Sequence, residues 1–437
     1  PSPPCPRARV DPCPRRPSAV YTARMSGRSV RVTTPLLLAL ALACNGGDAH
    51  TDGGTSSATT SAAATTSSSG TTESAPTTAA PTTASTGAEP TGSTDPDATT
   101  GAPSNCAPQS PTASAVCVEG TRLLVGRRVD GVLAEATPYR IQGVCWSPTG
   151  VGETNTAGYS QYYLQYGATD APLIEGLGAN TVKTYDPFAR TPEALALLDD
   201  LHARGIMVAM TVLAWHGDAG PKEYLAAVDY FKDHPAILMW IVGNEFNYNN
   251  LYGAADLDEA TAIVNEAIDM IHAADPDHPV AVGHGEVPSP ERYAAIPSAD
   301  VWALNLYPAL DLDSRFVAWP QLSDKPFFVS EYGADAFDNG AGQEDQAAQA
   351  EATEALTMQI MDHYSADDPA EAGLGGTIFV LTDEWWKADG SPNDHDDGGF
   401  PGAIHADGFA NEEWWGLMTV DRQPRAAYDA LKALYGG

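Results

Sequence analysis

The stretch "HPAILMWIVGNEFNYNN" at residues 234–250 joins a continuous apolar run to an abrupt polar end. The run has the length and the β-branched, aromatic character of a strand that is buried on both faces, as strands of parallel sheets are. Gly243, Asn244 and Glu245 follow it directly. A carboxyl group is therefore expected at the carboxyl end of a core strand.

Similar apolar runs recur along residues 140–437 and alternate with amphipathic stretches, a pattern typical of parallel strands joined by crossover helices. The expected strands are 140–146, 180–186, 206–215, 236–245, 279–286, 301–308, 326–333 and 376–386. The predicted fold class is α/β, a (β/α)8 TIM barrel, with an open doubly wound sheet as the alternative. No glycine-rich phosphate loop follows any run, which disfavours the open sheet.

Helix boundaries are marked between these runs. Thr191 followed by Pro192 is a capping residue before a proline at the first helical position. Gly178 and Gly205 stand where helices are expected to end. The signals fall between the expected strands, as a barrel requires.

The N-terminal part of the chain has the composition of a leader. We interpret residues 1–24 as a spurious extension ahead of a start at Met25. Residues 25–44 combine a short basic region with an apolar run too short to span a bilayer, and they resemble a bacterial lipoprotein signal whose Cys44 would carry lipid. A plain secretory signal with an incidental cysteine is the alternative.

Residues 45–105 are almost entirely Thr, Ser, Ala, Gly and Pro, which predicts a disordered linker between a membrane and the folded domain. Residues 106–139 are expected to form a hairpin or cap ahead of the catalytic barrel at 140–437. Cys106 and Cys117 lie at the start of the folded region and are candidates for a disulfide in an exported protein. The protein is expected outside the cytoplasm, anchored at a bacterial membrane.

The 437-residue chain is strongly acidic, with 57 Asp and Glu against 23 Lys and Arg and a formal net charge of −34. A nucleic-acid partner is excluded because binding to phosphate backbones needs a basic surface. Membrane contact is expected only through the lipid on Cys44.

In a barrel the carboxyl ends of the strands meet at one rim, so the informative residues are those at which each apolar run turns polar. These residues are dominated by carboxylates and aromatic rings, without a tight His cluster or a Ser-His-Asp set. In chain order they are Trp146, Lys183, Tyr185, Asp186, Trp215, His216, Asn244, Glu245, His284, Glu286, Asn305, Tyr307, Glu331, Asp383, Glu384, Trp385 and Trp386.

Two of these carboxylates suit cleavage of a glycosidic bond. Glu245 ends the fourth expected strand and Glu331 ends the seventh, so the two face each other across the mouth. That placement lets them approach to the roughly 5 Å that a retaining mechanism requires, while aromatic rings stack on sugar faces.

The motifs "WIVGNE" (240–245) and "FFVSEYG" (327–333) resemble the clan of retaining (β/α)8 glycoside hydrolases with an Asn-Glu at strand four and a Glu at strand seven. "GANTVKTYDP", "NLYP" and "TDEWWK" are further similar to the catalytic barrel of glycoside hydrolase family 2 and to β-1,3-glucanosyltransferases. The resemblance covers the whole barrel and implies that Glu245 is the acid/base and Glu331 the nucleophile.

The resemblance also implies roles for neighbouring residues. Asn244 would hold the 2-hydroxyl of the sugar bound to Glu331, Tyr307 would donate a hydrogen bond to Glu331, and Trp385 or Trp386 would form the floor of the sugar site.

Three other rim residues are candidates for substrate contact. Lys183 stands where the clan often has an arginine, so a compact point charge replaces a bidentate fork near the nucleophile. Trp215 offers an aromatic wall, and His284 a hydrogen-bonding one.

The predicted function is therefore that of a retaining β-glycosidase or transglycosylase acting on a β-linked oligo- or polysaccharide, without a metal or cofactor. The alternatives are a non-catalytic glycan-binding surface lipoprotein and a metal-dependent barrel hydrolase. β-1,3-glucan, β-mannan and β-galactoside all stay open as substrates. A calcium site that uses Asp394, Asp396 or Asp397 in the long loop 391–417 is a lesser possibility.

Overall fold

The computed structural model describes residues 114–129, 132–388 and 390–436. The predicted leader, Cys44, the linker and Cys106 lie outside these residues, so what the sequence indicates about them stays a prediction. Within the described part, no helix is both long and apolar enough to cross a membrane.

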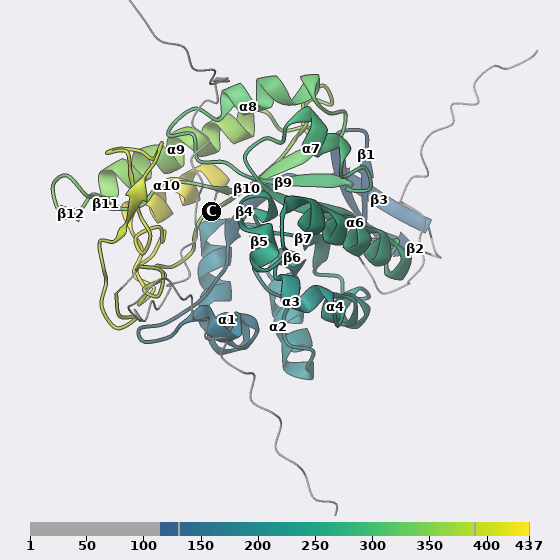
Figure 1. The fold of residues 1–437 in the computed structure, drawn as a ribbon, viewed down its shortest axis with the longest axis horizontal. Helices are drawn as coiled ribbons and strands as arrows, with labels where there is room; N and C mark the ends of the chain where they lie inside the picture. Colours follow the sequence, from purple (N-terminus) through teal and green to yellow (C-terminus); the bar gives the residue numbers. More distant parts are fainter. Residues whose placement is uncertain (1–113, 130–131, 389, 437) are drawn as a thin grey trace, which may run out of the picture.

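Eight parallel strands close into a barrel with neighbours in the order β10-β13-β4-β5-β6-β7-β8-β9 (Figure 1). The strands are β4 (Ile141–Cys145), β5 (Thr181–Lys183), β6 (Met207–Leu213), β7 (Ile237–Val242), β8 (Val280–Gly285), β9 (Val301–Asn305), β10 (Phe327–Tyr332) and β13 (Gly373–Ile378). The predicted (β/α)8 barrel is confirmed, and the open sheet is wrong because β13 pairs with β4 and closes the ring.

The last strand is the one that the sequence misplaced. It was expected at 376–386, but β13 runs from Gly373 to Ile378 and the chain then leaves the barrel. The strand is rich in glycine, which has low strand propensity, so its sequence does not indicate a strand. Gly375 is required there: its φ is +121°, and a side chain would collide with the backbone of Ile141 on the neighbouring strand. Residues 379–386 consequently form the rim and not the wall.

Helices cover the outside of the barrel (Figure 1). They are α1 (Ser160–Leu177), α2 (Pro192–Ala203), α3 (His216–Ala219), α4 (Glu223–Phe231), α5 (Phe246–Asn249), α6 (Leu257–Ala274), α7 (Pro290–Ala294), α8 (Asp313–Ala318), α9 (Gln346–Asp362) and α10 (Ala426–Tyr435). The side chain of Thr191 accepts a hydrogen bond from the Ala194 N–H at the start of α2, and Gly178 ends α1 with φ of 84°. Both capping predictions are confirmed.

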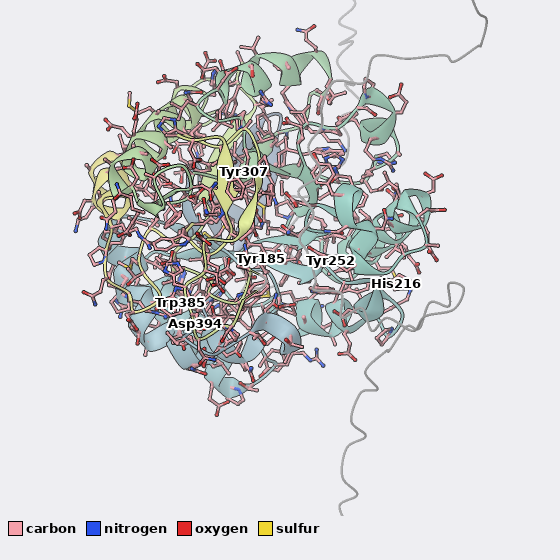
Figure 2. All side chains as sticks on the ribbon, turned by 60° about the vertical axis from the view of Figure 1, so that its left-hand side comes forward. Tyr185, His216, Tyr252, Tyr307, Trp385 and Asp394 are labelled. Atoms are coloured by element: carbon pink, nitrogen blue, oxygen red, sulfur yellow. The ribbon has the colours of Figure 1, made fainter. Side chains whose placement is uncertain are left out.

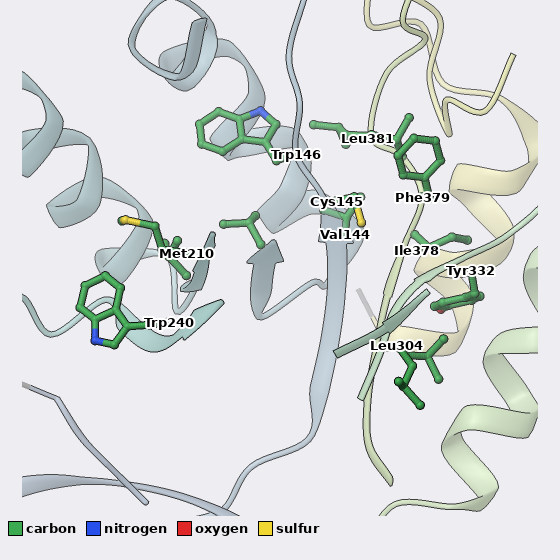
Figure 3. Close-up of a cluster of buried hydrophobic side chains, with 14 of the residues drawn as sticks. Val144, Cys145, Trp146, Met210, Trp240, Leu304, Tyr332, Ile378, Phe379 and Leu381 are labelled. Carbon is green, nitrogen blue, oxygen red and sulfur yellow. The ribbon is translucent and has the colours of Figure 1, made fainter. Parts of the chain in front are cut away.

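The core has two layers, because each strand is buried on both faces. Side chains such as Met210, Trp240 and Leu304 pack between strands and helices (Figure 3). A second cluster with Met239 and Phe328 fills the inside of the barrel. Side chains of β7 thus pack into both layers of the core, which explains why the strand has no polar face.

A three-stranded antiparallel sheet precedes the barrel: β1 (Ala115–Glu119), β2 (Arg122–Val129) and β3 (Val132–Pro138). Val116 and Leu123 from this sheet belong to the buried cluster inside the barrel, so the sheet closes the end opposite the mouth. Cys117 is disulfide-bonded and Cys145 is a free, buried thiol. The predicted partner, Cys106, lies outside the described residues.

Short hairpins lie in the loops that follow the carboxyl ends of β10 and β13, at the mouth of the barrel. β11 (Phe337–Asp338) pairs with β12 (Gln343–Glu344), and β14 (Gly399–Pro401) pairs with β15 (Phe409–Asn411) in the long loop after β13. Single 3-10 turns lie at Asn155–Ala157, Asn250–Tyr252 and Trp319–Gln321. These insertions build the walls of the site.

Candidate active site

Glu245 is positioned by a sharp turn of the backbone after β7. Gly243 has φ of +84°, and a Cβ there would lie 3.1 Å from the carbonyl oxygen of Gly283, so only glycine fits. Glu245 itself has φ of 50°, an uncommon backbone conformation for a residue with a side chain. Such strain persists only where the surrounding structure holds it.

Glu331 lies on β10 with three donors around its carboxylate. The ammonium of Lys183 lies 2.7 Å from Oε1, the hydroxyl of Tyr185 donates to the same oxygen at 2.8 Å, and the hydroxyl of Tyr307 donates to Oε2 at 2.9 Å. Glu331 is 5% exposed. Both oxygens are therefore fixed in direction by one ammonium and two hydroxyl donors.

Lys183 links the nucleophile candidate to the fourth strand. Its ammonium also donates to Oδ1 of Asn244 at 3.0 Å, and its side chain is 1% exposed. Tyr185 joins this group although sequence reasoning gave it no role. The sequence did contain a signal for Tyr185: it lies two residues after Lys183, and side chains two residues apart in a strand point to the same side.

The two carboxyl groups influence each other. Burial raises the pKa of Glu245 to about 8, the negative charge of Glu331 adds to the rise, and a hydrogen bond from Asn305 together with Lys183 opposes it. Glu245 is thus held protonated near neutral pH beside a carboxylate that is surrounded by donors. Opposite protonation states in one pair of carboxyl groups are what acid catalysis with a nucleophile needs.

A cavity of about 1030 Å³ opens at this rim. Tyr185, Tyr252 and Tyr307 line it, and in Figure 2 Trp385 and Asp394, from the chain after β13, lie on the other side of Tyr185 from Tyr252. The polar and aromatic residues of its lining are Thr154, Asn155, Thr156, Tyr159, Ser160, Tyr185, Asp186, Arg190, Thr211, Trp215, Asp218, Glu223, Tyr224, Asn244, Tyr252, Tyr307, Glu331, Phe379, Glu384, Trp386, Lys387, Phe400, Glu412 and Trp415. Its size suits a small oligosaccharide segment.

Several predicted site residues meet at this cavity. Asn244, Tyr307, Glu331, Trp215 and Trp386 line it. The ring of Trp215 stacks on Tyr252 with centroids 4.2 Å apart. The stacked pair forms a rigid aromatic wall, because each ring holds the other in place.

Glu245 lies just behind the lining. It is 4% exposed, next to Asn244, which lines the cavity. Tyr252 is close enough that the charge of Glu245, after burial, contributes to raising the pKa of its phenol. Lys183 is likewise behind the wall, through its contact with Glu331.

Two predicted contact residues lie elsewhere. His284 is buried beside Phe246 and Trp302, donates from Nδ1 to the carbonyl oxygen of Glu286, and has a pKa lowered to about 4 by burial. Trp385 stacks on His395, away from the cavity. The structure therefore separates Trp385 from Trp386, since neighbouring side chains in a turn point in different directions.

His395 also stacks on Trp414 of the same loop, with ring centroids 3.6 Å apart, and its contact with Trp385 ties the loop 391–417 to the rim. The calcium possibility finds no support: among the residues that the structure describes, no three His, Cys, Asp or Glu side chains are grouped to hold a metal ion. Asp394, Asp396 and Asp397 are therefore not arranged as ligands.

Sequence reasoning missed a polar group at the eighth strand. The ammonium of Lys387 lies 2.9 Å from Oε2 of Glu384, and the hydroxyl of Tyr159 donates to Oε1 of the same carboxylate at 2.8 Å. From the sequence, Glu384 was identified only as an acid at the end of an expected strand, without a role, as was Glu286. Glu286, the other such acid, forms a bidentate pair with Arg315.

Comparison with known proteins agrees with this architecture. Residues 222–437 match the model of "Glycosyl hydrolases family 2, TIM barrel domain". A β-glucuronidase of Sus scrofa is 27% identical over 189 residues, which cover 38% of this chain and 27% of that protein. The predicted resemblance to the family 2 catalytic barrel is confirmed.

Solved structures share the fold. The β-glucuronidase of Faecalibacterium prausnitzii has 19% identity and a TM-score of 0.50, with 74% of this chain and 51% of that chain covered. A galacturonate-bound family 2 β-galacturonidase from Eisenbergiella tayi has 18% identity and a TM-score of 0.51, with 74% and 54% covered. The chain thus spans about half the length of these structures and about a quarter of the curated relative.

Proposed function

We propose, from a barrel that resembles the catalytic domain of family 2 glycosyl hydrolases, that this protein cleaves or transfers β-linked glycosides with retention of configuration. Glu331 acts as the nucleophile and Glu245 as the acid/base. The observation that carries the proposal is the difference between the two carboxyl groups: three donors surround Glu331, whereas burial and the charge of Glu331 raise the pKa of Glu245 to about 8.

In the first step an oxygen of Glu331 forms a bond to the anomeric carbon as the bond to the leaving oxygen breaks. The proton of Glu245 goes to that oxygen, so the aglycone departs as an alcohol. Glu245 is 4% exposed, and its contact with the glycosidic oxygen is expected to form only in the substrate complex, as catalytic hydrogen bonds often do.

In the second step Glu245 takes a proton from water or from a sugar hydroxyl, whose oxygen then displaces Glu331 from the anomeric carbon. Burial still raises the pKa of Glu245, but esterified Glu331 carries no charge, so the part of the rise that comes from that charge disappears and Glu245 serves as a base. Water gives hydrolysis and a sugar gives transfer.

The surrounding residues have matching roles. Asn244 is oriented by Lys183 and by Asn305, whose amide donates at 3.4 Å, and is proposed to bind the 2-hydroxyl of the sugar. Tyr307 and Tyr185 orient the two oxygens of Glu331. The stacked pair Trp215 and Tyr252 is proposed as a platform for a sugar ring.

The test of this function is product analysis on a panel of β-glucans, β-mannans and β-galactosides, with Glu331→Gln as the blank. A β-anomer as the first product, detected by proton NMR before mutarotation, supports retention. An α-anomer as the first product contradicts it. Binding without any product supports instead the non-catalytic glycan-binding lipoprotein, and loss of activity with a chelator supports the metal-dependent hydrolase.

Replacing Lys183 with methionine is expected to lower kcat and to destabilise the fold. The change leaves Glu331 buried without its cation, a loss worth about 3 kcal/mol in the free energy of unfolding. Denaturant unfolding and kinetics on one substrate measure both effects. Lys183→Arg is the matched control because it keeps the charge; equal damage in both variants would show that shape, and not charge, is what Lys183 supplies.

Export and lipid anchoring at Cys44 belong to the same proposal, supported by the sequence of residues 25–44. In a bacterial host, wild-type protein is expected in the membrane fraction and Cys44→Ala in the soluble one. Equal distribution of the two would remove the lipid anchor and leave the plain secretory signal.

A further inference from the structure

We propose that the sugar bound next to Glu331 is neutral, with a hydroxymethyl group or hydrogen in place of the carboxylate of a uronic acid. This inference rests on the proposed function and narrows its substrate class. It separates this chain from the relatives named above, whose names refer to glucuronic and galacturonic acid.

A uronic acid carries a carboxylate, which needs a cation or several free donors when it leaves water. Among the residues that the structure describes, the Lys and Arg side chains that line the cavity are Arg190 and Lys387. Each already pairs with a carboxylate of the protein. Arg190 lies 3.0 Å from an oxygen of Glu223, and the Arg190 side chain is 41% exposed at the outer edge.

Lys387 is engaged more completely. Its ammonium lies 2.9 Å from Oε2 of Glu384, and it stands over the ring of Phe379 at 4.1 Å from the centroid. Its side chain is 8% exposed. A substrate carboxylate could take this cation only by leaving Glu384 buried without a cation beside it, which is costly.

The remaining charges of the lining are negative. Glu331, Glu384, Glu412 and Asp186 all line the cavity. Burial raises the pKa of Glu412, and the charges of Glu384 and Glu331 add to the rise while Lys387 opposes it. Burial likewise raises the pKa of Asp186 to about 6. The carboxylates on this wall already repel one another, so a further anion is disfavoured.

Neutral sugars fit the same wall. An ionised carboxylate is only an acceptor, and a hydroxyl group is a donor that pays no ionic desolvation cost. The carboxylate of Glu412, which lines the cavity, can therefore accept hydrogen bonds from the hydroxyl groups of a hexose, and Trp386 also lines the cavity and supplies an apolar surface.

Matched substrates test the inference, because a β-glucuronide and a β-glucoside differ only at C6. The 4-nitrophenyl glycosides of glucose and glucuronic acid, and of galactose and galacturonic acid, are compared by kcat/KM. Within each pair the neutral glycoside is expected to be favoured by about 100-fold or more, since placing like charges together costs several kcal/mol. A uronide that is cleaved as well as its neutral counterpart would overturn the inference while leaving the proposed function intact.

Binding of the free sugars is measured on the same samples by ligand-observed NMR, so the comparison does not depend on turnover. Tighter binding of glucose than of glucuronate, or of galactose than of galacturonate, supports the inference. Equal binding of the two sugars, tighter binding of the uronate, or binding of neither counts against the inference. Absence of turnover on all glycosides, with neutral sugars still bound, would instead count against the proposed function alone.

One pair of variants isolates the charge. Glu412→Gln removes a carboxylate from the cavity and is expected to raise the ratio of kcat/KM for the uronide to that for the neutral glycoside by about 10-fold. Glu354→Gln removes the same charge from the exposed side of α9 and is expected to leave the ratio unchanged. An equal ratio in both variants would show that Glu412 does not repel the substrate.

Discussion

Replacing Glu331 with alanine is expected to lower kcat for β-glycosides by about 10⁵-fold or more, the scale seen when an enzyme loses its nucleophile. The covalent step has no substitute, because the other acids of the rim lack the same set of three donors. Steady-state kinetics on an activated aryl glycoside measures the loss.

Added azide makes this prediction sharper. In Glu331→Ala the small anion fits the space of the missing carboxyl group and attacks the same face of the sugar, so the product is the α-glycosyl azide. Glu286→Ala is the matched control: it removes an acid at the end of β8 that is paired with Arg315, and it is expected to keep near-normal kcat. Residual activity of Glu331→Ala within 10-fold of wild type would assign the nucleophile to another residue.

Replacing Glu245 with alanine is expected to have an effect that depends on the leaving group. Natural glycans, whose leaving alcohols need a proton, should lose about 10³-fold or more in kcat, within the range for general acid catalysis. Aryl glycosides with acidic phenols should lose much less in the first step. A series of aryl glycosides measures this as a steeper dependence on the pKa of the leaving phenol.

The pH profile supplies a second measurement on Glu245. Its pKa is raised to about 8, so the proton needed for the first step is present below pH 8 and is lost as the pH rises through that value. Wild-type kcat/KM is therefore expected to fall on the alkaline side near pH 8, and Glu245→Gln is expected to lose that limb. A variant that keeps the limb would assign it to a different acid.

The predicted strands and the two glutamates at strand ends came from local patterns. An apolar run of strand length, buried on both faces, has to end where the barrel and its helices stop covering it, and Glu245 and Glu331 stand at such ends. Register around a closed parallel barrel then places strand four across from strand seven without any further information.

The same local reasoning failed where local signals were weak or ambiguous. The glycine-rich start of β13 lacks strand propensity, so the strand was expected too late in the chain. Trp385 and Trp386 were indistinguishable in the sequence, and only the path of the loop decides that Trp386 meets the cavity. His284 was given a place on the wall, and packing against Phe246 and Trp302 turns it inward.

By itself, the sequence determined the barrel and the position of its reactive rim, because hydrophobic periodicity and strand ends are local properties of the chain. Only the tertiary structure decided which charged side chains of the rim are paired with another side chain. Lys183 meets Glu331 from 148 residues away, and Tyr159 meets Glu384 from 225 residues away. Distances between such side chains depend on closure of the whole ring, and that closure places Lys183 beside Glu331 and Lys387 beside Glu384.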